Sequence, residues 1–220
     1  MGAVAATLVY EDLWLAFELI LLAAVFDFLD GLTARLLKQY SEVGVQLDSM
    51  ADLVSFGVAP AIMLYFVVLW LCEPAWIADG VWYERLTVVP FIITAFSALR
   101  LAKFNIDDTQ HEEFCGLPTP ANAILCGALA VLCISEDLPI PSEGIMIFAV
   151  VMSLLLVSPI RMFSFKFKRL SWRGNELRIL FALFVVALMI CLPFIYAIPI
   201  IIVTYIVVST VRWIVQCCRK

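Results

Sequence analysis

Apolar stretches follow one another along almost the whole chain, and short polar segments separate them. A helix that crosses the hydrocarbon core of a bilayer needs about 20 consecutive, mostly apolar residues. By this criterion the pattern predicts seven membrane spans. They cover residues 13–37, 48–71, 87–106, 119–135, 144–163, 177–194 and 197–216. We therefore expect an all-α fold, a polytopic transmembrane helix bundle.

The first ten residues are also apolar, but they are too short to cross about 30 Å of hydrocarbon. No basic region precedes them, as a secretory signal peptide would require. We expect the chain to begin inside a further, truncated helix, so that the complete protein has an eighth span. Because little chain remains outside the spans, residues 1–220 are expected to form a single membrane-embedded domain.

Composition and charge agree with a membrane protein. The chain is 64% hydrophobic and 15% charged, whereas soluble domains are about 45–50% apolar. The net charge of −5 gives no indication of nucleic-acid binding. Of the 14 Lys and Arg residues, only Arg85 lies on the opposite side of the predicted spans from the others. By the positive-inside rule, the loops 38–47, 104–118 and 161–178 and the C-terminus are cytoplasmic.

Four aspartates interrupt the first two predicted spans: Asp27 and Asp30 in the first, Asp48 and Asp52 in the second. An ionised carboxylate in the hydrocarbon costs at least ~3 kcal/mol, so four of them require compensation. A short cytoplasmic turn joins the two helices, and an antiparallel pair would bring the four carboxylates together. This arrangement predicts a site for divalent cations that is open to the cytoplasm.

Small residues accompany the aspartates on the same helical faces. Gly31 and Ala34 continue the stripe that begins at Asp27, and Gly44 lies one turn before the second pair of aspartates. Such residues let a large group approach closely. Arg35 follows at the cytoplasmic end, where a cation can meet a phosphate. Intramembrane carboxylates can also form an ion path in a transporter or channel, but such a path needs neither the small residues nor the arginine.

The spacing of these residues resembles the signature of the CDP-alcohol phosphatidyltransferases. In this sequence it reads Asp27-x2-Asp30-Gly31-x2-Ala34-Arg35-x8-Gly44-x3-Asp48-x3-Asp52. The resemblance implies a homodimeric integral membrane enzyme that transfers a phosphatidyl group from CDP-diacylglycerol to an alcohol and releases CMP. It places the family core at about 13–135, with additional spans at about 144–216.

The same resemblance implies a role for each signature residue. Two divalent cations, Mg²⁺ or Mn²⁺, would be bound by the four aspartates Asp27, Asp30, Asp48 and Asp52. Asp52 would in addition be the catalytic general base. The CDP-lipid would be bound by Gly31, Ala34, Arg35 and Gly44. These assignments agree with the affinity of hard divalent cations for carboxylate oxygens and with their ability to neutralise a leaving phosphate.

Three further segments, 52–60, 98–105 and 114–122, are similar to those of the membrane-embedded phosphatidylserine synthases of bacteria and archaea. This similarity implies L-serine as the acceptor and a prokaryotic cytoplasmic membrane as the location. Serine carries a carboxylate, so its pocket needs a cation, which Arg100 or Lys103 could supply. Lys103 stands where the resemblance leads us to expect arginine.

Other polar residues lie near the same predicted mouth, and we include Asn105, Thr119 and Asn122 among the acceptor-binding candidates. A phosphorylated acceptor, such as glycerol 3-phosphate or inositol phosphate, is the alternative within the same chemistry. It would favour several convergent basic side chains. Few are available here besides Arg100, Lys103 and those of residues 161–178, so serine is the preferred acceptor.

Overall fold

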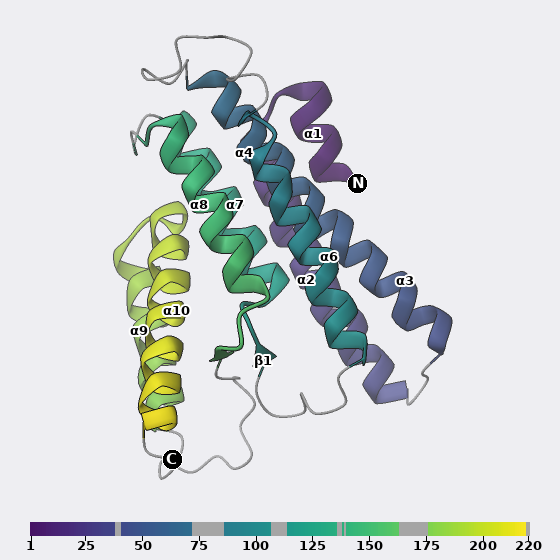
Figure 1. The fold of residues 1–220 in the computed structure, drawn as a ribbon, viewed down its shortest axis with the longest axis vertical. Helices are drawn as coiled ribbons and strands as arrows, with labels where there is room; N and C mark the ends of the chain where they lie inside the picture. The colour runs from purple at the N-terminus through teal and green to yellow at the C-terminus, as the bar shows by residue number, and fades with distance from the viewer. Residues whose placement is uncertain are drawn as a thin grey trace.

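The computed structural model is a bundle of helices (Figure 1). It describes residues 1–37, 41–71, 86–106, 114–135, 138, 140–162 and 176–218. The helices are α1 (Gly2–Tyr10), α2 (Leu13–Leu37), α3 (Glu42–Asp52), α4 (Ala59–Trp70), α6 (Ile92–Ile106), α7 (Thr119–Ile134), α8 (Ser142–Leu156), α9 (Glu176–Cys191) and α10 (Phe194–Cys218). Two short strands, β1 (Phe114–Cys115) and β2 (Arg161–Met162), pair antiparallel. Apart from these strands, the expected all-helical bundle is confirmed.

The predicted spans all coincide largely with helices, but these helices differ in whether they are long and apolar enough to cross a membrane. Three helical segments are both long and apolar enough to cross a bilayer, namely Val43–Trp70, Val89–Ile106 and Phe194–Cys218. Helices α7, α8 and α9 are apolar but shorter. Helix α2 has 25 residues and carries the charges of Glu18, Asp27 and Asp30. The count of seven full spans therefore remains a prediction.

Two predicted boundaries are wrong, each for a local reason. In the span predicted at 144–163, the helix ends at Leu156 and the chain then enters β2. Pro159 cannot continue a helix and disfavours helical geometry at the residue before it. The span predicted at 48–71 belongs to a longer helix that begins at Glu42, since Ser41 caps its N-terminus by accepting a hydrogen bond from the Gly44 amide at 2.9 Å.

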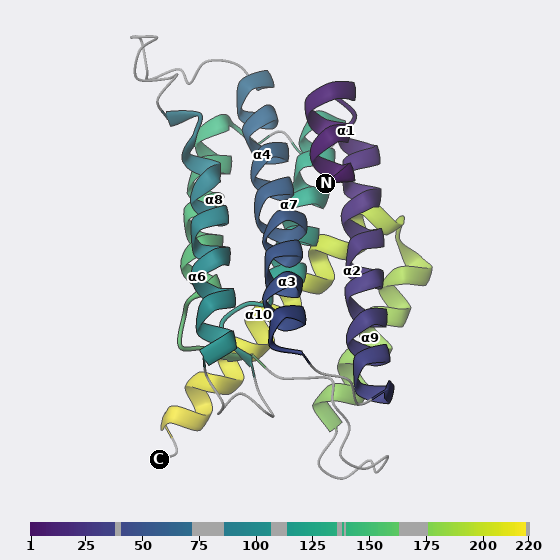
Figure 2. The ribbon, with the colours of Figure 1, turned by 90° about the vertical axis from the view of Figure 1, so that its right-hand side faces the viewer.

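Helices α3 and α4 form one continuous column through a π-helical segment, Leu53–Val58 (Figure 2). This segment begins directly after Asp52, and the backbone hydrogen bonds of a π-helix join residues five apart instead of four. Thr94 of α6 donates to the carbonyl oxygen of Gly57 at 3.1 Å. The irregular turn is thus tied to α6, and this contact places Asp52 beside the helix that carries Arg100.

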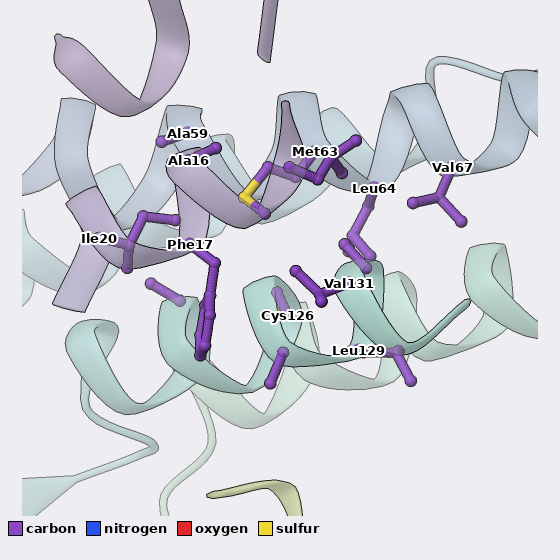
Figure 3. Packing of buried hydrophobic residues seen from close by; sticks show 14 of the residues in the cluster. Ala16, Phe17, Ile20, Ala59, Met63, Leu64, Val67, Cys126, Leu129 and Val131 are labelled. Atoms are coloured by element: carbon purple, nitrogen blue, oxygen red, sulfur yellow. The ribbon is translucent and has the colours of Figure 1, made fainter. Parts of the chain in front are cut away.

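The larger hydrophobic core lies between α2, α4 and α7 (Figure 3). Phe17 and Ile20 of α2 pack with Met63 and Leu64 of α4 and with Cys126 of α7, and all five are fully or almost fully buried. A second buried cluster joins the α9–α10 hairpin to α7, α8 and β2. Its members are Leu117, Leu125, Met152, Met162, Phe181 and Tyr205. Helix α7 belongs to both clusters and so connects the two halves of the bundle.

The segments predicted to face the cytoplasm lie together at one end of the bundle. The C-terminal ends of α2, α6 and α10 and the start of α3 are all found there, at the bottom of Figure 1. β1 and the start of α7 lie at the same end. This arrangement agrees with the predicted sidedness, while the assignment of this end to the cytoplasm remains a prediction.

Candidate functional site

Three carboxyl groups from two helices meet near this end of the bundle. Asp27 and Asp30 of α2 and Asp48 of α3 each offer one oxygen atom, and these three atoms lie within 4.8 Å of one another. Asp27 is half-buried, whereas Asp30 and Asp48 are exposed. The predicted pooling of carboxylates from the first two spans is confirmed for these three residues.

The donor set fits a hard divalent cation. Ligand oxygens of Mg²⁺ or Ca²⁺ lie about 2.0–2.6 Å from the ion, so two ligands on opposite sides are about 4–5 Å apart. The three aspartate oxygens meet this condition. Three ionised carboxylates at such a separation repel one another unless a cation lies between them. The cluster can therefore hold a divalent metal and, through it, a phosphate.

Asp52 lies one helical turn after Asp48 and is not a member of the group of three. It is half-buried. Its carboxyl group interacts electrostatically with the other three aspartates and also with Arg100. Asp52 is thus the acidic residue that connects the carboxylate cluster to the basic residue on α6. Its assignments as a fourth ligand and as general base remain predictions.

The small residues of the signature differ in their surroundings. A Cβ atom built on Gly31 meets no other atom within 4 Å, so the space beside this residue of α2 is open. At Gly44 a Cβ would come within 2.8 Å of the Ser41 oxygen that caps α3. A side chain at Gly44 would therefore crowd the helix cap, while Gly31 leaves room for a ligand. Ala34 is half-buried, and the side chain of Arg35 lies outside the described part of the structure.

A buried basic residue, Arg100 of α6, interacts electrostatically with Asp52. The Arg100 side chain is 8% exposed, and its Nη1 donates to Thr119 Oγ1 at 3.3 Å. Asn122 is fully buried and accepts a bond from the Cys126 thiol at 3.7 Å. Arg100 Nε and Asn122 Nδ2 have no hydrogen-bond partner among the described residues. Because buried donors without acceptors are costly, these two groups are suited to bind an anionic ligand.

A cavity of about 360 Å³ adjoins Arg100. Lys103, one turn further along α6, lines it together with Cys115 of β1 and Ser158, which follows α8. The two basic residues were predicted from the sequence as site residues, whereas Cys115 and Ser158 were not. The strand pairing brings these residues to the cavity, and a two-residue strand has no recognisable pattern in the sequence.

Gly116 lies between the chain segments of Cys115 and Leu156, two residues that line this cavity. This residue has a φ of 76°, in the left-handed region, and its amide donates to the carbonyl oxygen of Ile160 at 2.9 Å. The following amide, that of Leu117, donates to Leu155 at 3.0 Å. A side chain at Gly116 would collide with the carbonyl oxygen of Leu156. Only glycine fits this backbone conformation at this close approach.

Asn105 does not join the other acceptor candidates. Its side-chain amide donates to Ser49 Oγ of α3 at 2.9 Å, in an exposed position. Arg100 is bonded to Thr119, Lys103 shares the cavity with Arg100, and Asn122 lies one turn after Thr119 on α7. Asn105 instead ties the end of α6 to the helix that carries Asp48. The assignment of the five residues to acceptor binding remains a prediction.

Comparison with known proteins identifies the family to which the chain is similar. The family model described as CDP-alcohol phosphatidyltransferase matches residues 1–157. The chain is 33% identical over 205 residues to the CDP-diacylglycerol–serine O-phosphatidyltransferase of Helicobacter pylori, a match that covers 89% of this chain and 78% of that protein. A protein with the same name from Methanocaldococcus jannaschii is 36% identical over 147 residues, 66% of this chain and 62% of its own length.

Proposed function

Since the chain belongs to the CDP-alcohol phosphatidyltransferase family, a family of transferases, we propose that it transfers the phosphatidyl group of CDP-diacylglycerol to the hydroxyl group of L-serine. The products are phosphatidylserine and CMP. The observation that carries this proposal is the cluster of three converging aspartate carboxylates from α2 and α3. The cluster suits a metal-bound pyrophosphate, and the buried basic residue Arg100 suits a small acceptor with a negative charge.

Asp27, Asp30 and Asp48 would hold divalent cations, Mg²⁺ or Mn²⁺, and we include Asp52 as the fourth ligand of a two-ion site. When bound, the ions neutralise the charge that grows on the leaving phosphate. The open space beside Gly31 would admit the nucleotide. Ala34, Arg35 and Gly44 complete the proposed CDP-lipid site, with Arg35 contacting phosphate.

Asp52 would remove the proton from the serine hydroxyl group as general base. The resulting oxygen attacks the phosphorus atom that carries the diacylglycerol group. A new O–P bond forms, the P–O bond to the CMP phosphate breaks, and CMP leaves. The half-buried position of Asp52, next to three other acidic groups and to Arg100, supports this assignment.

The acceptor would be held by its carboxylate. Arg100 presents a buried Nε without a partner among the described residues, and Asn122 presents a second such donor. Thr119 fixes the guanidinium through its hydrogen bond to Nη1. Lys103, at the cavity, adds a second positive charge. Serine thus binds with its carboxylate toward α6 and α7 and its hydroxyl group toward Asp52.

We further propose that the enzyme is a homodimer in a prokaryotic cytoplasmic membrane and that the site faces the cytoplasm. The family core covers about 13–135, and the helices at about 144–216 are additional. The grouping of basic residues at the end of the bundle that carries the site supports this orientation.

The test is an acceptor assay. Purified protein is supplied with CDP-diacylglycerol and Mn²⁺, together with L-serine, sn-glycerol 3-phosphate or inositol phosphate in separate reactions, and CMP release is measured. We expect release with serine and none above background with the phosphorylated acceptors. Release with glycerol 3-phosphate but none with serine would refute serine as the acceptor while leaving the transferase chemistry in place.

A further inference from the structure

The cavity beside Arg100 is lined by groups of opposite electrostatic character. Two positive side chains, Arg100 and Lys103, come from the last two turns of α6. The C-terminal end of α8 also reaches the cavity, with Leu156, Val157 and Ser158. Because the last carbonyl groups of a helix point outward, this end of a helix favours a positive charge. One part of the cavity thus suits an anion, and another part suits a cation.

Ser158 is held in place by a carbonyl group that several donors share. Its hydroxyl group donates to the carbonyl oxygen of Leu155 at 2.9 Å, and its amide donates to the same oxygen at 3.4 Å. The amide of Leu117, between β1 and α7, also donates to this oxygen, at 3.0 Å. The Ser158 side chain therefore cannot rotate without losing a hydrogen bond.

The direction of the side-chain bond decides what Ser158 can bind. A serine hydroxyl group has one proton and two lone pairs. A carbonyl oxygen can only accept, so the proton of Ser158 is used in the bond to Leu155. The oxygen is left with lone pairs alone. Ser158 is therefore suited to a donor such as an ammonium group and poorly suited to an anion.

The remaining lining of the cavity limits what could bind an ammonium group. Among the described residues that line it there is no carboxylate, and Ser158 is the one with a hydroxyl group. Arg100 supplies the anion-binding part, because it is 8% exposed and its Nε has no partner among the described residues. An α-amino acid carries a carboxylate and an ammonium group on one carbon atom, so it matches both parts of the cavity.

We propose that Ser158, together with the C-terminal end of α8, binds the ammonium group of the amino-acid acceptor, while Arg100 binds its carboxylate. This inference rests on the proposed function and adds the group that distinguishes an amino acid from other hydroxy acids. Ser158 lies directly after residues 1–157, which the family model matches. Membership of the family therefore does not assign it a role.

The test compares L-serine with 3-hydroxypropanoate, which has the same carboxylate and hydroxyl groups but no ammonium group. Formation of phosphatidylserine from labelled serine is measured at saturating CDP-diacylglycerol, with 3-hydroxypropanoate as the competitor. In Ser158→Ala we expect the KM for serine to rise about tenfold, as for the loss of one hydrogen bond to a charged group. The inhibition constant of 3-hydroxypropanoate should equal that of the wild type.

The matched control is Ser135→Ala. Ser135 directly follows α7, is partly buried like Ser158, and donates to the carbonyl oxygen of Val131 at 2.9 Å. It does not line the cavity. Both variants lose the same kind of bond, so we expect similar unfolding temperatures in detergent. Only Ser158→Ala should change the KM for serine.

Several results would overturn the ammonium site and leave the proposed function in place. They are an unchanged KM for serine in Ser158→Ala, an equal rise in Ser135→Ala, or an inhibition constant of 3-hydroxypropanoate that rises as much as the KM. An inactive Ser158→Ala protein would also count against it, because the loss of one ammonium contact leaves the reaction possible. So would the absence of inhibition in the wild type at 3-hydroxypropanoate concentrations a hundred times the KM for serine, about tenfold beyond the expected loss of affinity. A wild-type protein that forms no phosphatidylserine would overturn the proposed function, and this inference with it.

Discussion

Arg100 offers a direct test of how the acceptor is recognised, because its guanidinium has several donors in a fixed plane. One of them, Nη1, is occupied by Thr119, and Nε is left without a partner among the described residues. Lysine in the same place keeps the positive charge but has a single nitrogen on a flexible chain. In Arg100→Lys the planar arrangement is lost, together with at least one hydrogen bond to the ligand.

The size of the effect follows from burial. Because Arg100 is only 8% exposed, water cannot readily replace the missing donor. Hydrogen bonds to charged groups contribute about 1.5–3 kcal/mol, which corresponds to a rise of roughly 10- to 150-fold in the KM for serine. We expect kcat to fall less and the KM for CDP-diacylglycerol to stay unchanged.

The assay is CMP release at varied serine and then at varied CDP-diacylglycerol, at fixed Mn²⁺. Arg178→Lys is a suitable control, since Arg178 lies near the start of α9 and does not line the cavity. A large rise in the KM for CDP-diacylglycerol, with serine unaffected, would refute the reasoning. It would show that Arg100 contacts the phosphates and that the carboxylate is bound elsewhere.

Four further predictions concern two aspartates of the signature and two glycines, one beside open space and one at a crowded position. Asp48→Ala should abolish turnover and weaken Mn²⁺ binding, measured by titration of the purified protein, because it removes one of three converging oxygen ligands. Asp52→Asn should keep measurable Mn²⁺ and CDP-lipid binding while CMP release is lost, since the amide cannot accept the serine proton. Gly116→Ala should lower stability by about 1–3 kcal/mol, seen as a lower unfolding temperature, because of its positive φ and the Leu156 carbonyl. Gly31→Ala should leave the unfolding temperature unchanged and raise the KM for CDP-diacylglycerol, since the space beside it is open.

Each of these predictions has a contrary result. Equal losses of metal binding and turnover in Asp52→Asn would indicate that this residue is a ligand rather than the base. An active Asp48→Ala protein would exclude the three-carboxylate cluster as the metal site. Equal stability of the two glycine variants would show that the close approach at Gly116 relaxes without cost.

Local spacing was sufficient to predict the carboxylate cluster. Asp27 and Asp30 share one helical face because they are three positions apart, and a short connection places the next helix antiparallel beside them. Asp48 then lies opposite at nearly the same depth, as the oxygen separations show. The helices themselves were predictable because every apolar stretch is long relative to its polar neighbours. These features depend on residues close together in the chain.

The acceptor site depended on contacts that the sequence pattern does not contain. Arg100 and Asn105 are five positions apart, about 140° around α6, and only the packing of α7 on one side and α3 on the other gives them separate roles. Tyr205 lies in a helix that is apolar on nearly every face. In a membrane chain apolar side chains suit both lipid and protein neighbours, so hydrophobicity alone cannot indicate which face is buried. That choice was made by the tertiary packing of α7, α9 and α10, which buries the tyrosine beside Leu125 and Phe181.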